Sequence, residues 1–167
     1  MCVSMPAALL ALMPAFAQSA AAYVAPPAPT YAQAMDDADA ARLALRVREE
    51  TRHAWQGYMQ YAKGHDALKP LSKAPHDWYP QSLLMTPVDA LDTLLLMGLD
   101  KEAAEARELI DTRLSFDHDM KVQNFEVVIR LLGGLLSGYQ MTGDKKLLDL
   151  ADDLGTRLLP VFETPTG

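Results

Sequence analysis

Two pairs of ionisable side chains lie in otherwise apolar stretches of the sequence. Asp89 and Asp92 are three residues apart, and Glu126 and Arg130 are four residues apart. At these spacings the members of each pair share one face of a helix. A buried carboxylate needs a hydrogen-bond partner, and a guanidinium donates several hydrogen bonds. Such groups can move protons or bind a polar substrate, or they can serve only as an ion pair and as acids at a helix start.

Other residue types that often carry chemistry do not form a site. His65 and Asp66 lie in a loop without a second histidine at metal-ligand spacing, so we predict that they pin the loop by hydrogen bonds rather than bind zinc. Ser137 has no general base near it in the sequence. The one cysteine, Cys2, lies in a segment that we expect to be removed, so the mature chain has neither a disulfide nor a thiol nucleophile.

The elements that must position these residues are five predicted helices. A helix beginning at Thr86 has Thr86 as N-cap and Pro87 in the first helical position. Asp100 and Asp144 are predicted to cap two later helices. The segment 63–85 is expected to be a long loop that the aromatic side chains of Trp78 and Tyr79 hold down. The helices are predicted over residues 39–62, from 86 to the stop at Gly98, 101–114, 124–141, and from 145 onward.

The second and fourth predicted helices are apolar on nearly all sides, whereas the third and fifth carry charges. We therefore expect the apolar pair to be inner helices and the charged pair to be outer helices. Gly133 and Gly134 interrupt the fourth helix and weaken it by roughly 1 kcal/mol each relative to alanine. That cost predicts that a neighbouring backbone or a ligand approaches closely.

A repeat with an offset of 44 residues relates two of these units. Met97, Asp100-Lys101 and Thr112-Arg113-Leu114 are matched by Met141, Asp144-Lys145 and Thr156-Arg157-Leu158. Each unit is an apolar helix, a tight turn and an amphipathic helix running back, so the fold class is all-α and the architecture is an αα-hairpin array. Periodicity alone leaves an open solenoid and a closed α/α barrel as alternatives.

Composition restricts the partners and suggests how the chain begins. The net charge of −7 without a basic cluster argues against nucleic-acid binding. Residues 1–17 resemble a signal peptide, because Met5–Phe16 is apolar and Ala15-Phe16-Ala17 suits a signal peptidase, although no Lys or Arg precedes the apolar run. We predict a flexible linker over 18–37, a folded region over 38–167, and a secreted or periplasmic protein.

Four blocks of sequence, in the right order, resemble glycoside hydrolase family 47, the class I α-1,2-mannosidases. The segment 61–72 resembles the family's Y-A-x-G-x-D-E-L-x-P-x-S, and 88–99 resembles its V-D-A-L-D-T-L…M-G-L helix. The segment 125–137 is similar to F-E-x-x-I-R-x-x-G-G-L-L-S, and 157–167 to R-L-L-P-A-F-x-T-P-T-G. Lys63 and Ala67 depart from the pattern, where an aromatic and an acid are common.

The resemblance implies a fold, an activity and site residues. The family fold is an (α/α)7 barrel, of which this chain would supply about the first two and a half hairpins. Family members hydrolyse terminal α-1,2-linked mannose of N-glycan-type oligosaccharides with inversion and hold a calcium ion, whose ligand we expect downstream of this chain. Glu126 matches the general acid. Arg130 matches an arginine of the same motif, and we predict that it binds substrate. We also predict Asp89 and Asp92 as substrate-binding residues in the polar lining of the barrel, with a structural role as the alternative. On this reading the fragment alone is inactive.

The assignment of Glu126 carries a physical tension. A general acid must hold a proton, yet a helix N-terminus and Arg130 one turn away both favour the carboxylate. Burial or other carboxylates can oppose this effect, or a bound water can deliver the proton. Two alternatives to an enzyme stay open: a mannose-binding, catalytically weak member of the same fold, and an αα-hairpin scaffold that binds a protein. The oligomeric state is not predicted.

Overall fold

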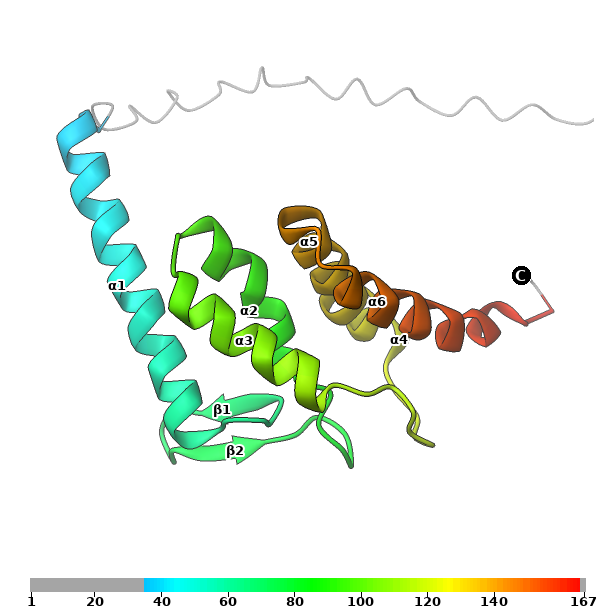
Figure 1. Cartoon of the computed structure of the whole chain (residues 1–167). Helices are drawn as coiled ribbons and strands as arrows, with labels where there is room; N and C mark the ends of the chain where they lie inside the picture. The colour runs from blue at the N-terminus through cyan, green and yellow to red at the C-terminus, as the bar shows by residue number, and fades with distance from the viewer. Residues whose placement is uncertain (1–34, 166–167) are drawn as a thin grey trace, which may run out of the picture. The chain divides into compact units, whose positions relative to one another are not determined.

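The computed structural model describes residues 35–165, which lie in the compact unit Asp36–Gly167 except for Met35. The predicted signal peptide and most of the predicted linker lie outside the described residues. The long helices of the described residues are α1 (Asp37–Tyr61), α2 (Met85–Leu96), α3 (Asp100–Arg113), α5 (Gly133–Thr142) and α6 (Lys145–Leu158) (Figure 1). The short segments are α4 (Asn124–Glu126), a π-helix η1 (Val127–Leu132) and a 3₁₀ helix η2 (Leu159–Phe162). The predicted all-α array of αα-hairpins is confirmed.

Two αα-hairpins, α2–α3 and α5–α6, form the centre of this unit, with α2 packed on α3, α5 and η1. Figure 1 shows α3 in front of α2, and α6 in front of α5. Gly98 and Gly143 turn the chain between the partners with φ of 62° and 70°, which a glycine adopts without steric cost. The apolar helices α2 and α5 thus form one layer, as predicted.

Side-chain bonds join the charged helices α3 and α6 to each other and join α3 to α1. Trp55 in α1 donates from Nε1 to Glu105 in α3 at 2.8 Å. Arg107 in α3 pairs with Asp144 at the start of α6, and Lys146 Nζ donates to the Asp111 carbonyl at 2.7 Å. The core between the layers consists of buried apolar side chains that include Leu91, Ile110, Leu131, Leu135 and Leu147. Within the described ranges no helix combines the length and the apolar character that crossing a membrane requires.

The segment 63–85 is more ordered than a plain loop. It contains an antiparallel pair of short strands, β1 (Ala67–Lys69) and β2 (Ala74–His76), with Ala67 opposite His76. The sequence analysis did not predict these strands, because each has three residues and shows no alternating pattern. The predicted pinning by His65 and Asp66 is confirmed: His65 Nδ1 lies 2.9 Å from Asp77 Oδ2, and the Asp66 carboxylate accepts hydrogen bonds within the same segment.

Two predicted helix caps differ from the structure. Helix α2 begins at Met85 after Leu84, which has a left-handed backbone and no capping side chain. The Thr86 hydroxyl does not cap the helix because it donates to the Asp66 carbonyl at 2.7 Å. Asp100 is the first residue of α3 rather than its cap. The Asp144 cap is confirmed, since its carboxylate accepts from Lys146 N at 3.1 Å.

The fourth predicted helix is continuous but not uniform. Its middle, Val127–Leu132, is a π-helix, which sequence periodicity does not reveal. Gly134 confirms the predicted close approach, because a Cβ there would lie 2.8 Å from Val88 Cγ1 and 3.0 Å from the Val88 carbonyl oxygen in α2. Gly133 does not: a Cβ at this position would have only an ordinary contact, 3.7 Å from the Val128 carbonyl oxygen.

Candidate active site

The candidate active site is centred on the Arg130 side chain, which π-helix η1 directs towards α2. Arg130 Nε donates to Glu126 Oε2 at 2.7 Å, and Nη1 donates to Asp89 Oδ2 at 2.9 Å. Both bonds are charge-assisted. The structure thus brings together three of the four predicted residues, two from the fourth predicted helix and one from the second.

The local backbone explains how Glu126 and Arg130 meet. Glu126 ends α4, and Arg130 lies inside the π-helical segment. A π-helix has more residues in each turn than an α-helix and frequently occurs at functional sites. Residues four apart on a helix share one face, which allows the short Nε–Oε2 bond.

The site is partly open to solvent. The side chains of Arg130, Asp89 and Glu126 are 38%, 34% and 23% exposed. Hydrogen bonds from Arg130 to Glu126 and Asp89 raise the pKa of the guanidinium above its usual value. Arg130 therefore stays charged at every pH at which the protein is folded. Among residues 35–165, no acceptor is paired with its Nη2 amino group.

Asp92 lies beside this cluster and bonds to a different partner. Its Oδ2 accepts from the Ser137 hydroxyl at 2.9 Å, and Thr93 Oγ1 lies 3.3 Å from its Oδ1. The need of Asp92 for a partner was predicted, but the partner was not. Ser137 follows Arg130 by seven residues, about two helical turns, so its position on the same face could have indicated the contact.

Trp78 is the residue that sequence reasoning missed at this site. The Arg130 guanidinium carbon lies 5.1 Å from the centre of the Trp78 ring, a cation–π distance. Trp78 is 39% exposed, so it covers the arginine rather than the core. It was predicted only to hold the loop down. Tyr79 does hold the chain, because its hydroxyl accepts from Gln123 N at 3.1 Å.

The described residues do not provide a metal site. Within 35–165 no group of three or more His, Cys, Asp and Glu side chains could hold a metal ion. The residues at the candidate site therefore do not fit a calcium ion by themselves. The calcium ion that the resemblance implies stays a prediction.

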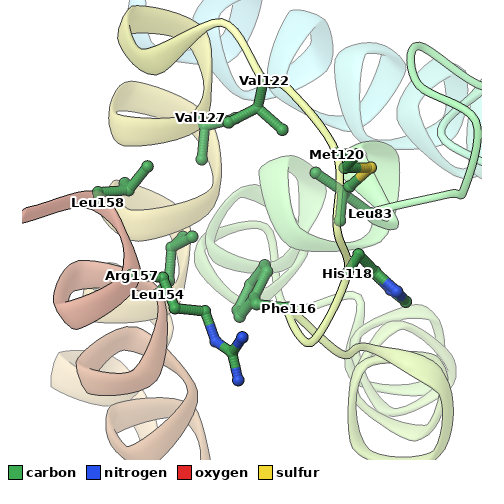
Figure 2. Close-up of a pocket in the computed structure, with 9 residues that line it drawn as sticks. All are labelled: Leu83, Phe116, His118, Met120, Val122, Val127, Leu154, Arg157 and Leu158. Atoms are coloured by element: carbon green, nitrogen blue, oxygen red, sulfur yellow. The ribbon is translucent and has the colours of Figure 1, made fainter. Parts of the chain in front are cut away.

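A separate cavity of about 310 Å³ lies between the end of α6, η1 and the segment 114–123 (Figure 2). Its lining is mostly apolar, with Phe116 and Leu154 among the contributing side chains and Arg157 and His118 as the polar members. None of the four candidate residues lines it. It presents no carboxylate, so it does not offer the pair of carboxyl groups that glycoside hydrolysis uses.

Comparisons with known proteins agree with the blocks found in the sequence. The model of the family described as Glycosyl hydrolase family 47 matches residues 50–167. The chain is 48% identical over 114 residues to the endoplasmic reticulum mannosyl-oligosaccharide 1,2-alpha-mannosidase of Homo sapiens, covering 68% of this chain and 16% of the relative. It is 47% identical over 120 residues to the enzyme of the same name of Rattus norvegicus, covering 72% of this chain and 18% of the relative.

A plant relative gives the same picture. The mannosyl-oligosaccharide 1,2-alpha-mannosidase MNS1 of Arabidopsis thaliana is 47% identical over 122 residues, which are 73% of this chain and 22% of the relative. The chain therefore spans only 16% to 22% of the length of these curated relatives.

These findings also correct one prediction. The human and rat relatives are named as endoplasmic reticulum enzymes, which contradicts the predicted secreted or periplasmic location. A leader-like apolar run followed by small residues does not distinguish these destinations. The family itself is established by the match over residues 50–167 and by these identities: the chain belongs to glycosyl hydrolase family 47.

Proposed function

We propose that the protein containing this chain is an inverting, calcium-dependent exo-α-1,2-mannosidase that removes terminal mannose from N-glycan-type oligosaccharides. The names of the relatives support the substrate class. The observation that carries the proposal is the cluster of Glu126, Arg130 and Asp89, held by 2.7 Å and 2.9 Å bonds across two apolar helices. Polar groups between such helices cost free energy unless they are hydrogen-bonded, and these three groups bond to one another while staying partly open to solvent.

Each side chain in the proposal has a chemical role. Glu126 is the general acid that protonates the departing glycosidic oxygen. Arg130 donates from its unpaired Nη2 to a sugar hydroxyl and orients Glu126 through Nε. Asp89 and Asp92 accept hydrogen bonds, from Arg130 and Ser137 respectively, and have further lone pairs for sugar hydroxyls.

The ion pair fixes the direction of the Glu126 side chain. Its Oε2 accepts from Arg130 Nε at 2.7 Å, so the carboxyl group is held in one orientation. We infer that Glu126 delivers its proton to the glycosidic oxygen either directly or through one bound water.

Inversion also requires a base that activates water on the opposite face of the sugar. In inverting enzymes the two carboxyl groups are about 6.5–9.5 Å apart. We assign no residue of this chain as the base. Residues 35–165 likewise form no site for calcium by themselves.

The same geometry favours one alternative function. A carboxylate that an arginine holds in place accepts hydrogen bonds from sugar hydroxyls, so a mannose-binding protein of the same fold with weak turnover would use the same cluster. Binding of mannosides that Glu126→Gln weakens, without mannose release by the wild type, would identify this alternative.

The test uses the longest natural protein that contains this chain and an α-1,2-linked mannose disaccharide. We expect mannose release that a calcium chelator abolishes and added calcium restores. Proton NMR during the first minutes should show β-mannose appearing before α-mannose, because the reaction inverts the anomeric centre. Initial release of α-mannose would refute inversion, and binding of a protein ligand without sugar binding or release would indicate a scaffold.

A further inference from the structure

Asp66 is an unusual residue among those the structure describes. It is 0% exposed, and Glu102 at 6% is the other buried charged side chain within 35–165. Glu102 pairs with Arg52 at 3.1 Å, whereas Asp66 has no ion pair with a described residue. An unpaired buried carboxylate is costly, so its hydrogen bonds must provide the compensation.

Those hydrogen bonds come from four donors in the segment that leads into α2. Oδ1 accepts from Leu83 N at 2.7 Å, Ser82 Oγ at 3.0 Å and Met85 N at 3.2 Å. Oδ2 accepts from Trp78 N at 2.9 Å. Three of the donors are backbone amides, so this carboxylate fixes the path of the chain itself.

The carboxylate also takes the place of an N-cap for α2. The residue before the helix, Leu84, cannot cap it by side chain, and the Met85 and Thr86 amides bond instead to the carboxylate and the carbonyl of Asp66. A negative charge at a helix N-terminus is favourable. Asp66 thus sets the position of the first turns of α2, where Asp89 lies.

Both segments that the Asp66 carboxylate holds, the one with Trp78 and the start of α2, lead to contacts with Arg130. One carboxylate oxygen of Asp66 holds Trp78, whose ring lies 5.1 Å from the Arg130 guanidinium carbon. The other holds the start of α2, whose Asp89 accepts from Arg130 at 2.9 Å. Two of the three groups in contact with Arg130 therefore depend on one side chain outside the site.

We propose that Asp66 is a positioning residue for the Glu126–Arg130 site, acting through Trp78 and through the start of α2. This inference rests on the proposed function for its effect on catalysis. The geometric part, that Asp66 keeps Trp78 against Arg130, stands without it.

The two oxygens allow a selective test. In Asp66→Asn the amide oxygen can still accept the three hydrogen bonds that Ser82 Oγ, Leu83 N and Met85 N donate. The NH₂ group then faces the Trp78 N–H, and two donors cannot bond to each other. The variant should release Trp78 while α2 stays in place. Glu102→Gln is the matched control, since it makes the same change at the other buried carboxylate.

Fluorescence tests the geometric part on the 167-residue chain. It has two tryptophans, Trp55 and Trp78, so Trp55→Phe leaves Trp78 as the reporter. In this background we expect Asp66→Asn to shift Trp78 emission to longer wavelength and to raise its acrylamide quenching by about twofold. Glu102→Gln should change neither. Unchanged Trp78 emission in Asp66→Asn would overturn the proposal.

A measurement without a variant at Asp66 covers the case in which Asp66→Asn does not fold. Amide hydrogen exchange of the unsubstituted chain should show protection of Trp78 N–H comparable to that of Leu83 and Met85. A Trp78 amide that exchanges as in an unfolded chain would show that Asp66 does not hold it.

Kinetics of the full-length protein test the effect on catalysis. We expect Asp66→Asn to lower kcat/KM roughly 10-fold to 100-fold, as small misplacements in active sites do. In a Trp78→Ala background the same change should have much less effect, whereas a merely structural role would give additive losses. Additive losses refute the positioning role. If the fluorescence shift is observed but neither the wild type nor any variant releases mannose, the proposed function is refuted and the positioning of Trp78 by Asp66 still stands.

Discussion

Arg130 has contacts with side chains from three different segments, and each contact uses a different feature of the guanidinium. Nε and Nη1 bond to Glu126 and Asp89, and the flat face lies over Trp78. Lysine has no planar fork and could not make these contacts at once. The spacing of Glu126 and Arg130 in the sequence predicted their pairing. The contact with Trp78 could not be predicted, because it depends on the path of the loop that carries Trp78. That loop is separated from Arg130 in the sequence by helices α2 and α3.

Replacement of Glu126 tests its role as general acid. We expect Glu126→Gln in the full-length protein to lower kcat on an α-1,2-linked mannoside by roughly 10²- to 10⁴-fold, since an amide cannot supply the proton. The control is Glu108→Gln, the same change at an exposed position of α3, which should leave kcat unchanged. Activity of Glu126→Gln within a few fold of wild type would exclude this residue as the acid.

Tyr58 gives a prediction about alkaline pH. Burial and the nearby charges of Asp66 and Asp77 raise the pKa of its phenol from 10.0 to about 12. The hydroxyl donates to the His65 carbonyl at 2.8 Å and accepts from Gly64 N at 3.2 Å. The folded chain thus prefers the neutral phenol. The stabilisation is complete below the unfolded pKa near 10 and is lost as pH rises towards 12.

The matched variant is Tyr58→Phe. Below pH 9 we expect it to lower the free energy of unfolding by about 1–2 kcal/mol, because two backbone groups lose their partner. Between pH 10 and 12 the difference from wild type should become smaller, since only the wild type has the phenol to ionise. Urea unfolding followed by circular dichroism measures both curves, and a constant difference across that range would contradict the prediction.

At the scale of elements, the sequence predicts what local chemistry determines. Helical periodicity predicted all the long helices. The Asp144 cap was also predicted correctly, because the capping side chain directly precedes its helix in the sequence. The start of α2 was predicted wrongly because its cap comes from Asp66, 19 residues before Met85. The π-helix and the two short strands likewise depend on tertiary contacts, which no local pattern records.

The two adjacent glycines of α5 offer a matched pair of substitutions. Gly134→Ala should lower the free energy of unfolding by about 1–3 kcal/mol, because the new methyl group would lie 2.8 Å from Val88 Cγ1 and 3.0 Å from the Val88 oxygen. Gly133→Ala meets nothing closer than 3.7 Å and should raise it by up to about 1 kcal/mol. Urea unfolding of both variants measures the difference. Equal effects would mean that α2 and α5 are not packed as described.

At the scale of the whole molecule, one face of the continuous helix α4–η1–α5 has no partner among the described residues. Phe125, Ile129 and Leu136 are 65%, 51% and 39% exposed along this face. The sequence predicted apolar inner helices, and the structure shows which side of them stays uncovered. An apolar stripe of this kind on a soluble unit promotes association.

The 167-residue chain by itself should therefore self-associate and bind a hydrophobic dye. Ile129→Lys combined with Leu136→Lys should reduce dye fluorescence by at least about half and shift the chain towards the monomer in size-exclusion chromatography with light scattering. Leu71→Lys is the control, because Leu71 is fully exposed between β1 and β2 and isolated from the stripe. A wild-type chain that is monodisperse and does not bind the dye would contradict this prediction.

Because Val127–Leu132 is a π-helix, the geometry of the site depends on the number of residues in this segment as well as on their side chains. The residues before it, which include Glu126, are rotated with respect to α5 by the extra residue that a π-helix accommodates. Removing a single residue from this segment would restore a regular helix and turn Glu126 by about 100° around the axis. Changes of length in this segment should therefore be tolerated far less well than changes of side chain.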